Sequence, residues 1–201
     1  MVTVADDAVQ LVVGLGNPGP GHAGDRHNVG FWFIDALAAM LALELRSDTR
    51  CKGALARAAS GLRLLKPQTF MNLSGDSVVA CAGYFRIAPS AIVVVHDDLD
   101  LPPGAIRVKR GGGHGGHNGL RSIDRQLGTT DYLRIRLGIG HPGPGGDVTS
   151  YVLGKPSADD RLLLETAIRT VLDSFDSICA GDLTRAMNAL NRRTINSGSN
   201  N

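Results

Sequence analysis

Residues 91–95 read AIVVV, a continuous apolar run that leads directly into the polar triplet His96-Asp97-Asp98. A β-branched run without polar alternation is typical of a strand covered on both faces, as in the middle of a parallel sheet. Ligand crevices in open α/β sheets form at the carboxyl ends of the strands. The run therefore predicts an α/β fold and places polar residues where such a fold carries its chemistry.

A second strand is predicted at residues 10–14, followed by a glycine-rich loop and by a helix from Asn28 to about residue 45, with Asn28 as a candidate N-cap. The loop residues GLGNPG match the G-x-G-x-x-G pattern of dinucleotide sites. However, Gly19 leads into Pro20-Gly21 rather than into a helix, and the position of the ribose-binding acid falls in or just after the helix. The context argues against a nicotinamide or flavin site, and we expect no cofactor.

The remaining pattern alternates between strands and helices, as α/β folds do. A domain over residues 1–195 and a disordered tail at 196–201 are predicted. The further predicted elements are a hairpin at 54–58 and 62–65, a helix from Ser74 to about Tyr84, a strand at 106–109, a helix capped by Asn118 and ending near Gly128, a strand at 132–137, a helix after Ser157 with Leu162, Leu163, Ala167, Val171, Leu172 and Phe175 on its apolar face, and a helix at 182–193.

Composition narrows the classes of protein. A chain of 201 residues with 43% hydrophobic content suits one compact domain, and 4% aromatic residues argue against a single-strand binder built on stacking. Three widely separated cysteines predict neither a disulfide framework nor a zinc knuckle. No apolar run approaches the roughly 20 residues that span a bilayer, and the first residues are acidic rather than basic. We therefore expect a cytoplasmic protein without membrane contact.

Positive charge is concentrated in one part of the chain. Residues 105–136 hold seven Lys and Arg side chains against two Asp, whereas the whole chain has a net charge of only +2. Such a cluster fits a phosphate-binding surface, although a solvated basic face would look the same in sequence.

A histidine and a carboxylate are candidates for acid–base chemistry. If the strands at 10–14 and 91–95 are neighbours, their carboxyl ends bring His27 and Asp97 together, and the carboxylate would orient the imidazole. The alternative is that Asp97 only caps a turn. Without a serine or cysteine nucleophile in a suitable setting, the pair favours activation of water. Asn17, in the glycine loop, can offer a donor and an acceptor to an amide.

Two further loops hold candidate ligand contacts. Phe70, Met71 and Asn72 precede a helix, where a buried asparagine would need several partners and the other two could fill the core. The loop GGGHGGHNG at 111–119 could cradle a phosphate or act as a mobile lid.

Taken in order, the motifs GLGNPG, RHN, FMNLSG, HDDLDLPPG, GGGHGGHNGL and LRIRLGIGHP resemble those of bacterial peptidyl-tRNA hydrolase, and the resemblance spans residues 11–190. It implies a twisted mixed β-sheet flanked by helices in a single domain. It also implies a monomeric, metal-independent esterase whose partner is peptidyl-tRNA, cleaved between the peptide and the terminal ribose.

Residue roles follow from the same resemblance. His27 would be the general base on water, Asp97 its supporting acid, and Asn17 the reader of the blocked amine. The other contacts would be Phe70, Asn72 and Asn118 with the peptide and terminal adenosine, Met71 with the cleft, and Lys109 and Arg136 with the 5′ phosphate of the acceptor stem.

One position departs from the family pattern. His22 stands where the family typically has a tyrosine that contacts the end of the tRNA, and Asp25 replaces a small hydroxyl residue. Histidine is smaller than tyrosine, so we expect His22 to be a weaker binding contact and not the base.

Two other functions stay open. An RNA-binding protein could keep the fold without catalysis, although it would need neither a base nor its acid. A metal hydrolase could use His114 and His117 with Asp97, Asp98 and Asp100, although H-x-x-H in a loop is a weak ligand pattern.

Overall fold

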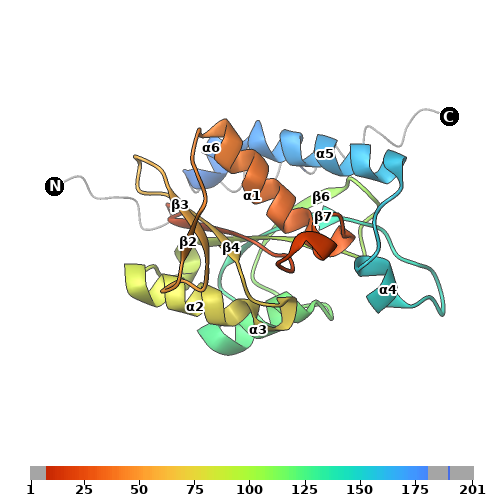
Figure 1. The fold of residues 1–201 in the computed structure, drawn as a ribbon, viewed down its shortest axis with the longest axis horizontal. Helices are drawn as coiled ribbons and strands as arrows, with labels where there is room; N and C mark the ends of the chain where they lie inside the picture. Colours follow the sequence, from red (N-terminus) through yellow and green to blue (C-terminus); the bar gives the residue numbers. More distant parts are fainter. Residues whose placement is uncertain (1–7, 181–189, 191–201) are drawn as a thin grey trace.

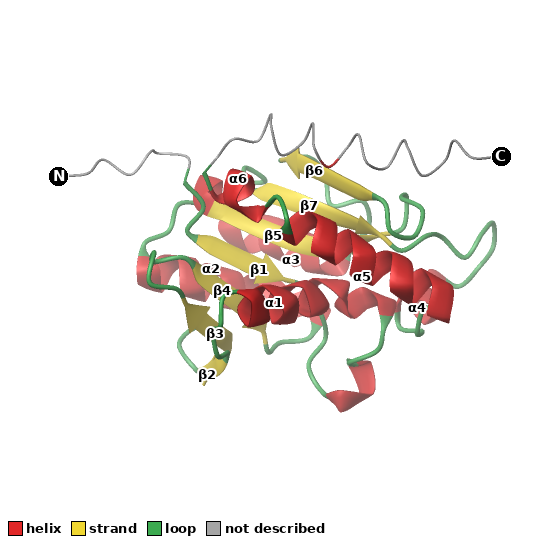
Figure 2. Cartoon of the chain, turned by 90° about the horizontal axis from the view of Figure 1, so that it is seen from above, coloured by secondary structure: helices red, strands yellow, loops and turns green. Residues whose placement is uncertain are grey.

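The structure is a computed structural model that describes residues 8–180 and Leu190. It contains one seven-stranded mixed sheet with helices on both faces (Figures 1 and 2). The strands are β1 (Leu11–Gly14), β2 (Arg46–Asp48), β3 (Gly53–Arg57), β4 (Arg63–Pro67), β5 (Ile92–Asp98), β6 (Ile106–Arg110) and β7 (Leu133–Gly138). The helices are α1 (Val29–Met40), α2 (Ser74–Phe85), α3 (Asn118–Leu127), α4 (Val148–Val152), α5 (Ala158–Leu172) and α6 (Phe175–Cys179), with 3-10 turns η1 (Pro20–His22), η2 (Arg26–Asn28), η3 (Met71–Leu73) and η4 (Pro89–Ala91).

The strand order, β2-β3-β4-β1-β5-β7-β6, places β5 between β1 and β7. The four central strands run parallel, and the outer strands pair antiparallel with their neighbours. Gly14 at the end of β1 pairs with Val95 of β5. The predicted neighbourhood of these two strands is therefore confirmed, and their carboxyl ends meet at one edge of the sheet.

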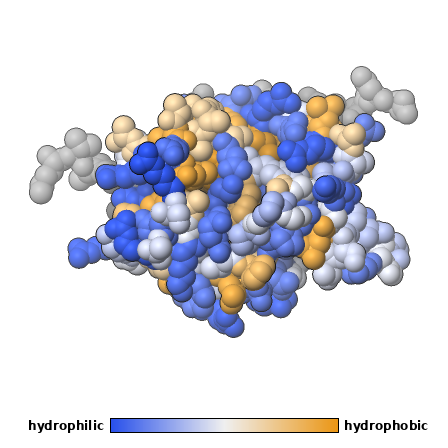
Figure 3. All heavy atoms as spheres, in the orientation of Figure 1, coloured by the Kyte–Doolittle hydropathy of each residue, from blue (hydrophilic) through white to orange (hydrophobic). Residues whose placement is uncertain are grey.

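Each face of the sheet carries its own apolar core. Val12, Val93 and Val95 pack with residues of α1 and α5, whereas Val13 and Val94 pack with residues of α2 and α3. Figure 1 shows α1 and α5 above the sheet and α2 and α3 below it. Because both faces are covered, β5 can be apolar at every position, as its sequence predicts. Figure 3 shows polar residues over most of one outer face, interrupted by apolar patches.

The first glycine of the GLGNPG loop allows α1 to pack closely against the sheet. A Cβ at Gly14 would lie 2.1 Å from the backbone oxygen of Gly30, and a Cβ at Gly30 would lie 2.4 Å from the backbone nitrogen of Leu15. Helix α1 therefore begins directly against the end of β1. The close packing of α1 against β1 therefore accounts for a glycine at position 14, and no bound pyrophosphate is needed to explain it.

Several predicted details are wrong. α1 ends at Met40, after which Ala42 adopts φ 52°, so the helix stops short of residue 45. Ser74 is the first residue of α2 and not its cap, because its hydroxyl donates backwards to the carbonyl of Met71. On α5, Leu162 and Leu163 are exposed, and the buried positions include Leu164 and Ile168.

Other predictions concern segments at the ends of the chain. The cap of α5 by Ser157 is confirmed, since its side chain accepts a hydrogen bond from the Asp160 amide. The predicted helix at 182–193 and the tail at 196–201 lie outside the described residues. Within the described ranges, no helix is long and apolar enough to cross a membrane.

Candidate active site

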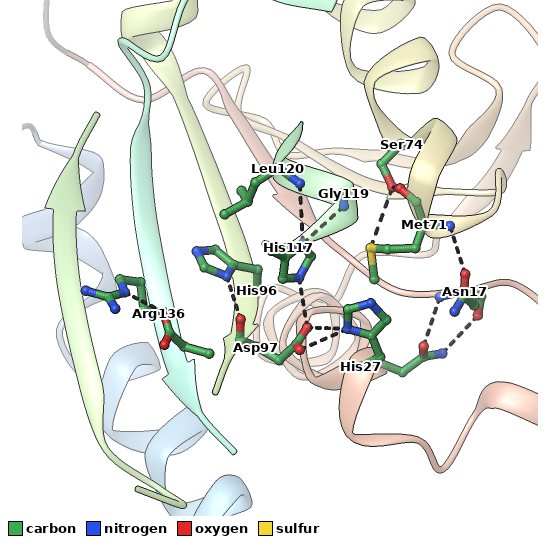
Figure 4. Close-up of polar contacts among 12 residues, drawn as sticks. Asn17, His27, Met71, Ser74, His96, Asp97, His117, Gly119, Leu120 and Arg136 are labelled. Atoms are coloured by element: carbon green, nitrogen blue, oxygen red, sulfur yellow. Dashed lines mark hydrogen bonds and ion pairs between the residues drawn. The ribbon is translucent and has the colours of Figure 1, made fainter. Parts of the chain in front are cut away.

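His27 and Asp97 lie together at the carboxyl edge of the central strands. His27 belongs to η2, immediately before α1, and Asp97 lies near the end of β5. The imidazole Nδ1 is 2.9 Å from each carboxylate oxygen, and both side chains are buried, with 10% and 2% of their surface exposed (Figure 4). The structure thus brings together the two residues that the sequence pairs only through strand order.

A second imidazole reaches the same carboxylate. His117 Nε2 is 3.0 Å from Asp97 Oδ1, and His117 Nδ1 accepts hydrogen bonds from the backbone N–H groups of Gly119 and Leu120 (Figure 4). The prediction that Asn118 caps α3 is therefore wrong, because the ring nitrogen of His117 supplies the cap and Asn118 is the first helical residue. Gly128 ends the helix in the left-handed conformation, as predicted.

These hydrogen bonds decide where the protons lie. Because His117 Nδ1 accepts two backbone N–H groups, the ring proton is on Nε2 and is donated to Asp97. His27 donates from Nδ1 to the same carboxylate, which leaves its Nε2 with a free lone pair. His27 is thus oriented with an unprotonated nitrogen available to a water molecule.

Electrostatics around the pair favour a charged His27. Burial alone lowers the pKa of His27, but the charge and hydrogen bond of Asp97, together with the charge of Asp25, raise this pKa above its usual 6.5. Burial alone would also raise the pKa of Asp97, yet the neighbouring imidazoles hold it well below its ordinary value. Asp97 is therefore an ionised carboxylate that can stabilise a proton on His27.

His96 precedes Asp97 on β5, and it contacts both Asp97 and His117. Its Nδ1 is 2.7 Å from the Asp97 carbonyl oxygen, and its ring meets that of His117 edge-on at 5.1 Å. Burial lowers the pKa of His96 to about 3. The ring is neutral, so it adds no charge that would compete with His27 for Asp97.

Asn17 is held by a network that the sequence did not predict. Its side-chain oxygen accepts from the backbone N–H of Met71 at 2.8 Å, and its backbone N–H and C=O both bond to the side chain of Asn28 at 2.9 Å. Because the oxygen is occupied, the Asn17 amide nitrogen remains as a donor. Asn28 was expected to cap α1, but it caps nothing and instead fixes this loop.

A cavity of about 770 Å³ surrounds the pair. Phe70 is 61% exposed, and Asn72 is exposed rather than buried. Every candidate site residue predicted from the sequence lines this cavity: Asn17, His22, His27, Phe70, Met71, Asn72, Asp97, Lys109, Asn118 and Arg136. The sequence suggested His117 only as a metal ligand and Asn28 only as a helix cap, so it predicted neither the hydrogen bond of His117 to Asp97 nor those of Asn28 to the Asn17 backbone.

Comparison with known proteins gives a consistent result. Residues 11–198 match the family described as peptidyl-tRNA hydrolase. The chain belongs to this family. Peptidyl-tRNA hydrolases from Delftia acidovorans and Halorhodospira halophila are 51% and 50% identical to it, over 89% and 90% of this chain and 87% and 95% of theirs. The crystal structure of peptidyl-tRNA hydrolase from Acinetobacter baumannii superimposes with a TM-score of 0.88 at 45% identity, covering 92% of this chain and 95% of that one.

The basic cluster is partly neutralised in the structure. Arg136 Nε lies 2.6 Å from Asp98 Oδ2, and the buried Arg134 bonds to the Gly113 carbonyl and to Asp124. Lys109 lines the cavity without an ion pair to any described residue. Of the two residues that the family resemblance assigns to a 5′ phosphate, Lys109 therefore has the free charge, and Arg136 has N–H groups but a compensated charge.

The donor set does not fit a metal ion. Among the described residues, the cluster that could hold one consists of His27, Asp97 and His117, and His114 instead accepts from the Gly116 amide. A neutral imidazole that binds a metal through one nitrogen carries its proton on the other. His117 Nδ1 cannot carry a proton while it accepts two backbone N–H groups. The metal-hydrolase alternative would require loss of the α3 cap.

Proposed function

We propose that this protein hydrolyses the ester between an N-blocked peptide and the 3′-terminal ribose of tRNA, with His27 as general base. The observation that carries this proposal is the buried His27–Asp97 pair, which leaves His27 Nε2 free in a large cavity. A protein that only bound RNA would have no use for an imidazole oriented in this way. Family membership supports the same substrate.

The reaction needs one water molecule and no covalent intermediate. His27 Nε2 removes a proton as the water attacks the ester carbonyl, and Asp97 stabilises the imidazolium that forms. The proton then passes from His27 to the ribose oxygen as the ester bond breaks. An alkoxide is a better leaving group than an amine, so a positioned water and a histidine suffice for an ester.

His117 acts as a positioning residue. Its Nε2–H holds one oxygen of Asp97, so the carboxylate cannot rotate away from His27. Since the same ring caps α3, the helix that begins at Asn118 is connected to the base through two hydrogen-bonded side chains. The start of α3 and the catalytic pair therefore form one unit.

Asn17 distinguishes blocked from free amines through its remaining donor. The amide nitrogen can donate to the carbonyl oxygen of a peptide bond or an N-acyl group, which an unblocked aminoacyl ester lacks. The pre-occupied oxygen prevents a competing contact with a free ammonium. Asn72, Asn118, Phe70 and Met71 line the adjoining surface and would hold the peptide and the terminal adenosine.

The outer part of the substrate is tRNA. Lys109, with Arg136 beside it, would bind the 5′ phosphate of the acceptor stem, because phosphate contacts fix register while the ester fixes the chemistry. The protein would act as a monomer in the cytoplasm, without cofactor or metal, and return tRNA to translation.

The test compares cleavage of N-acetyl-aminoacyl-tRNA and unblocked aminoacyl-tRNA by the wild type, His27→Ala and Asn17→Ala. We expect the wild type to cleave the blocked ester selectively, His27→Ala to lose most of its activity, and Asn17→Ala to lose selectivity. His141→Ala is the matched control, because His141 lies outside the cavity in an exposed loop. Equal cleavage of both esters by the wild type would contradict the role of Asn17, and RNA binding without cleavage would favour the binding protein.

A further inference from the structure

A buried arginine holds the middle of the glycine loop at residues 111–116, and the proposed chemistry does not use it. The side chain of Arg134 is 4% exposed, and its guanidinium carbon lies 4.8 Å from the centre of the Tyr132 ring. Nη1 donates to the Gly113 carbonyl oxygen at 2.8 Å, and Nη2 lies 3.4 Å from Asp124 Oδ1, which also accepts from the Tyr132 hydroxyl at 2.6 Å. Arg134 therefore joins the loop to helix α3 through one enclosed guanidinium group.

The surroundings of Arg134 make it a structural cation rather than a ligand contact. Its positive charge faces the carboxylate of Asp124, which is 16% exposed. A guanidinium that turned toward a phosphate in the cavity would leave Asp124 without its counter-charge, and breaking a largely buried ion pair in this way is strongly unfavourable. The hydrogen bond to Gly113 would be lost as well. We therefore expect Arg134 to keep its partners when substrate binds.

Lys109 lies directly opposite Arg134 on the neighbouring strand. The two residues are register partners of β6 and β7, which lie side by side in Figure 2, so their side chains leave the same face of the sheet. Like charges in such a position repel each other. The Lys109 head group packs against the glycine loop, where a Cβ added at Gly112 would lie 2.6 Å from Nζ and 2.8 Å from Cε. Lys109 and Arg134 thus contact adjacent residues of one loop.

The glycine loop depends on Arg134 for its conformation. Five of the six residues at 111–116 are glycines, so the chain there has wide conformational freedom. The hydrogen bonds of His114 remain local, whereas the bond from Arg134 ties the middle of the loop to β7. Gly112 directly precedes the residue that accepts this bond. Arg134 therefore fixes the surface against which Lys109 packs.

We propose that Arg134 positions the ammonium group of Lys109 for a phosphate by fixing the glycine loop at Gly113. This inference rests on the proposed function, in which Lys109 binds the 5′ phosphate of tRNA. A long, exposed lysine side chain loses conformational freedom when it binds, and a surface that already limits its positions reduces that loss. Arg134 is a positioning residue in this scheme, because it acts through the loop and Lys109 and contacts neither the phosphate nor the reacting ester.

The experiment compares N-acetyl-aminoacyl-tRNA that carries a 5′ phosphate with the same substrate carrying a 5′ hydroxyl. The readout is the ratio of the two kcat/KM values, which we expect to be about ten in the wild type, as for one charged contact. Lys109→Ala should bring this ratio close to one. Arg134→Gln should lower it about fivefold through KM for the phosphorylated substrate, with kcat and cleavage of the 5′-hydroxyl substrate nearly retained. A folding defect would lower both kcat/KM values alike and leave their ratio unchanged.

Three further variants test the route from Arg134 to Lys109. Arg134→Lys keeps a charge and a donor but lacks the planar fork that reaches Gly113 and Asp124 together, so its ratio should lie between those of the wild type and Arg134→Gln. Gly112→Ala adds a side chain at φ 91° in the position of the Lys109 head group, so the ratio should fall with Arg134 intact. The double variant of Arg134→Gln and Lys109→Ala should have the ratio of Lys109→Ala alone, because both changes act through one ammonium group.

The matched control is Arg57→Gln, which removes an exposed arginine at the end of β3, separated from β6 by four strands of the sheet. Its ratio should equal that of the wild type. An unchanged ratio in Arg134→Gln, or a wild-type ratio of one, would overturn the inference. Unchanged ratios in both Arg134→Lys and Gly112→Ala would overturn it even if Arg134→Gln fails to fold. Failure of the wild type to cleave either blocked ester would instead contradict the proposed function itself.

Discussion

Two histidine–aspartate contacts of nearly equal length, His27–Asp97 and His22–Asp25, each place an imidazole in the lining of the cavity, and their surroundings differ. In the inner pair, His27 and Asp97 are 70 residues apart in sequence, and the imidazole is 10% exposed. In the outer pair, His22 and Asp25 are three residues apart, and the imidazole is 36% exposed. Pair geometry alone therefore does not distinguish a base from a binding group.

The difference lies in what else touches the carboxylate. Asp97 receives a second N–H from His117, whose ring is fixed in turn by the start of α3. Asp25 has no such second imidazole among the residues that the structure describes, although its charge adds to the field that raises the pKa of His27. The inner carboxylate is thus held by two imidazoles, which fixes the orientation that proton transfer requires, whereas the outer imidazole is more exposed to the cavity.

Replacing each imidazole tests this comparison most directly. His27→Ala should lower kcat about 10³-fold, because general base catalysis typically contributes between about 10² and 10⁴. His22→Ala should act on KM instead. Single-turnover cleavage of N-acetyl-aminoacyl-tRNA measures both, and the opposite pattern would make His22 the base.

Replacing the inner carboxylate should have the next largest effect. Asp97→Asn presents an amide that cannot both accept from Nδ1 of His27 and balance its positive charge, so kcat should fall about 10²-fold or more. Asp25→Asn is the matched change in the outer pair, and there KM should rise more than kcat falls. A comparable loss of kcat in both variants would remove the distinction between the pairs.

Removing the second donor to Asp97 should have an intermediate effect. His117→Ser can still cap α3 but cannot reach the carboxylate, so we expect kcat to fall about tenfold, the scale of one charge-assisted hydrogen bond. The pKa seen in the pH–rate profile should rise, because Asp97 then interacts with His27 alone. His117→Ala should show the same kinetic change with a further loss of about 1 kcal/mol in unfolding free energy from the missing cap. A pH–rate profile identical to the wild type would contradict the positioning role.

Loosening the loop that holds Asn17 should have a smaller effect. Asn28→Ala removes two hydrogen bonds to the Asn17 backbone, and KM for the blocked ester should rise about fivefold, as for one neutral hydrogen bond. Steady-state kinetics on blocked and unblocked esters would show reduced selectivity with kcat nearly retained. Unchanged selectivity would show that Met71 alone fixes the Asn17 side chain.

The pH dependence should show the smallest and most specific difference. Because the pKa of His27 is raised and the base must be unprotonated, kcat/KM should increase with pH through a midpoint above 6.5. In Asp97→Asn, burial is no longer opposed by the carboxylate charge, so the residual activity should have a lower midpoint. A wild-type midpoint below 6.5 would contradict the electrostatic account.

Local sequence patterns alone already determined much of the architecture. The apolar run at 91–95 predicted a central strand, and the polar triplet after it predicted the edge of the sheet that carries the cavity. Local turn chemistry likewise predicted the hairpin of β3 and β4 and the Ser157 cap of α5. These features depend on residues within a few positions of one another, and such short-range preferences can be inferred from sequence.

Other features were decided only when distant segments met. α5 contains three leucines in succession, so its apolar pattern does not define one face, and packing against the sheet selects Leu164 for burial. Asn118 and His117 are both plausible caps, but only His117 can also donate to Asp97, which arrives from another strand.

The two histidine–aspartate pairs show the same difference between local and long-range determinants. His22 and Asp25 lie within one turn, so their contact needs only local backbone geometry. His27, Asp97 and His117 come from three separate elements, and the order of the strands brings them together. The sequence by itself determined the residue types available for catalysis. Tertiary structure decided which carboxylate is shared by two imidazoles, because the protonation of a buried group depends on every neighbour that packing places around it.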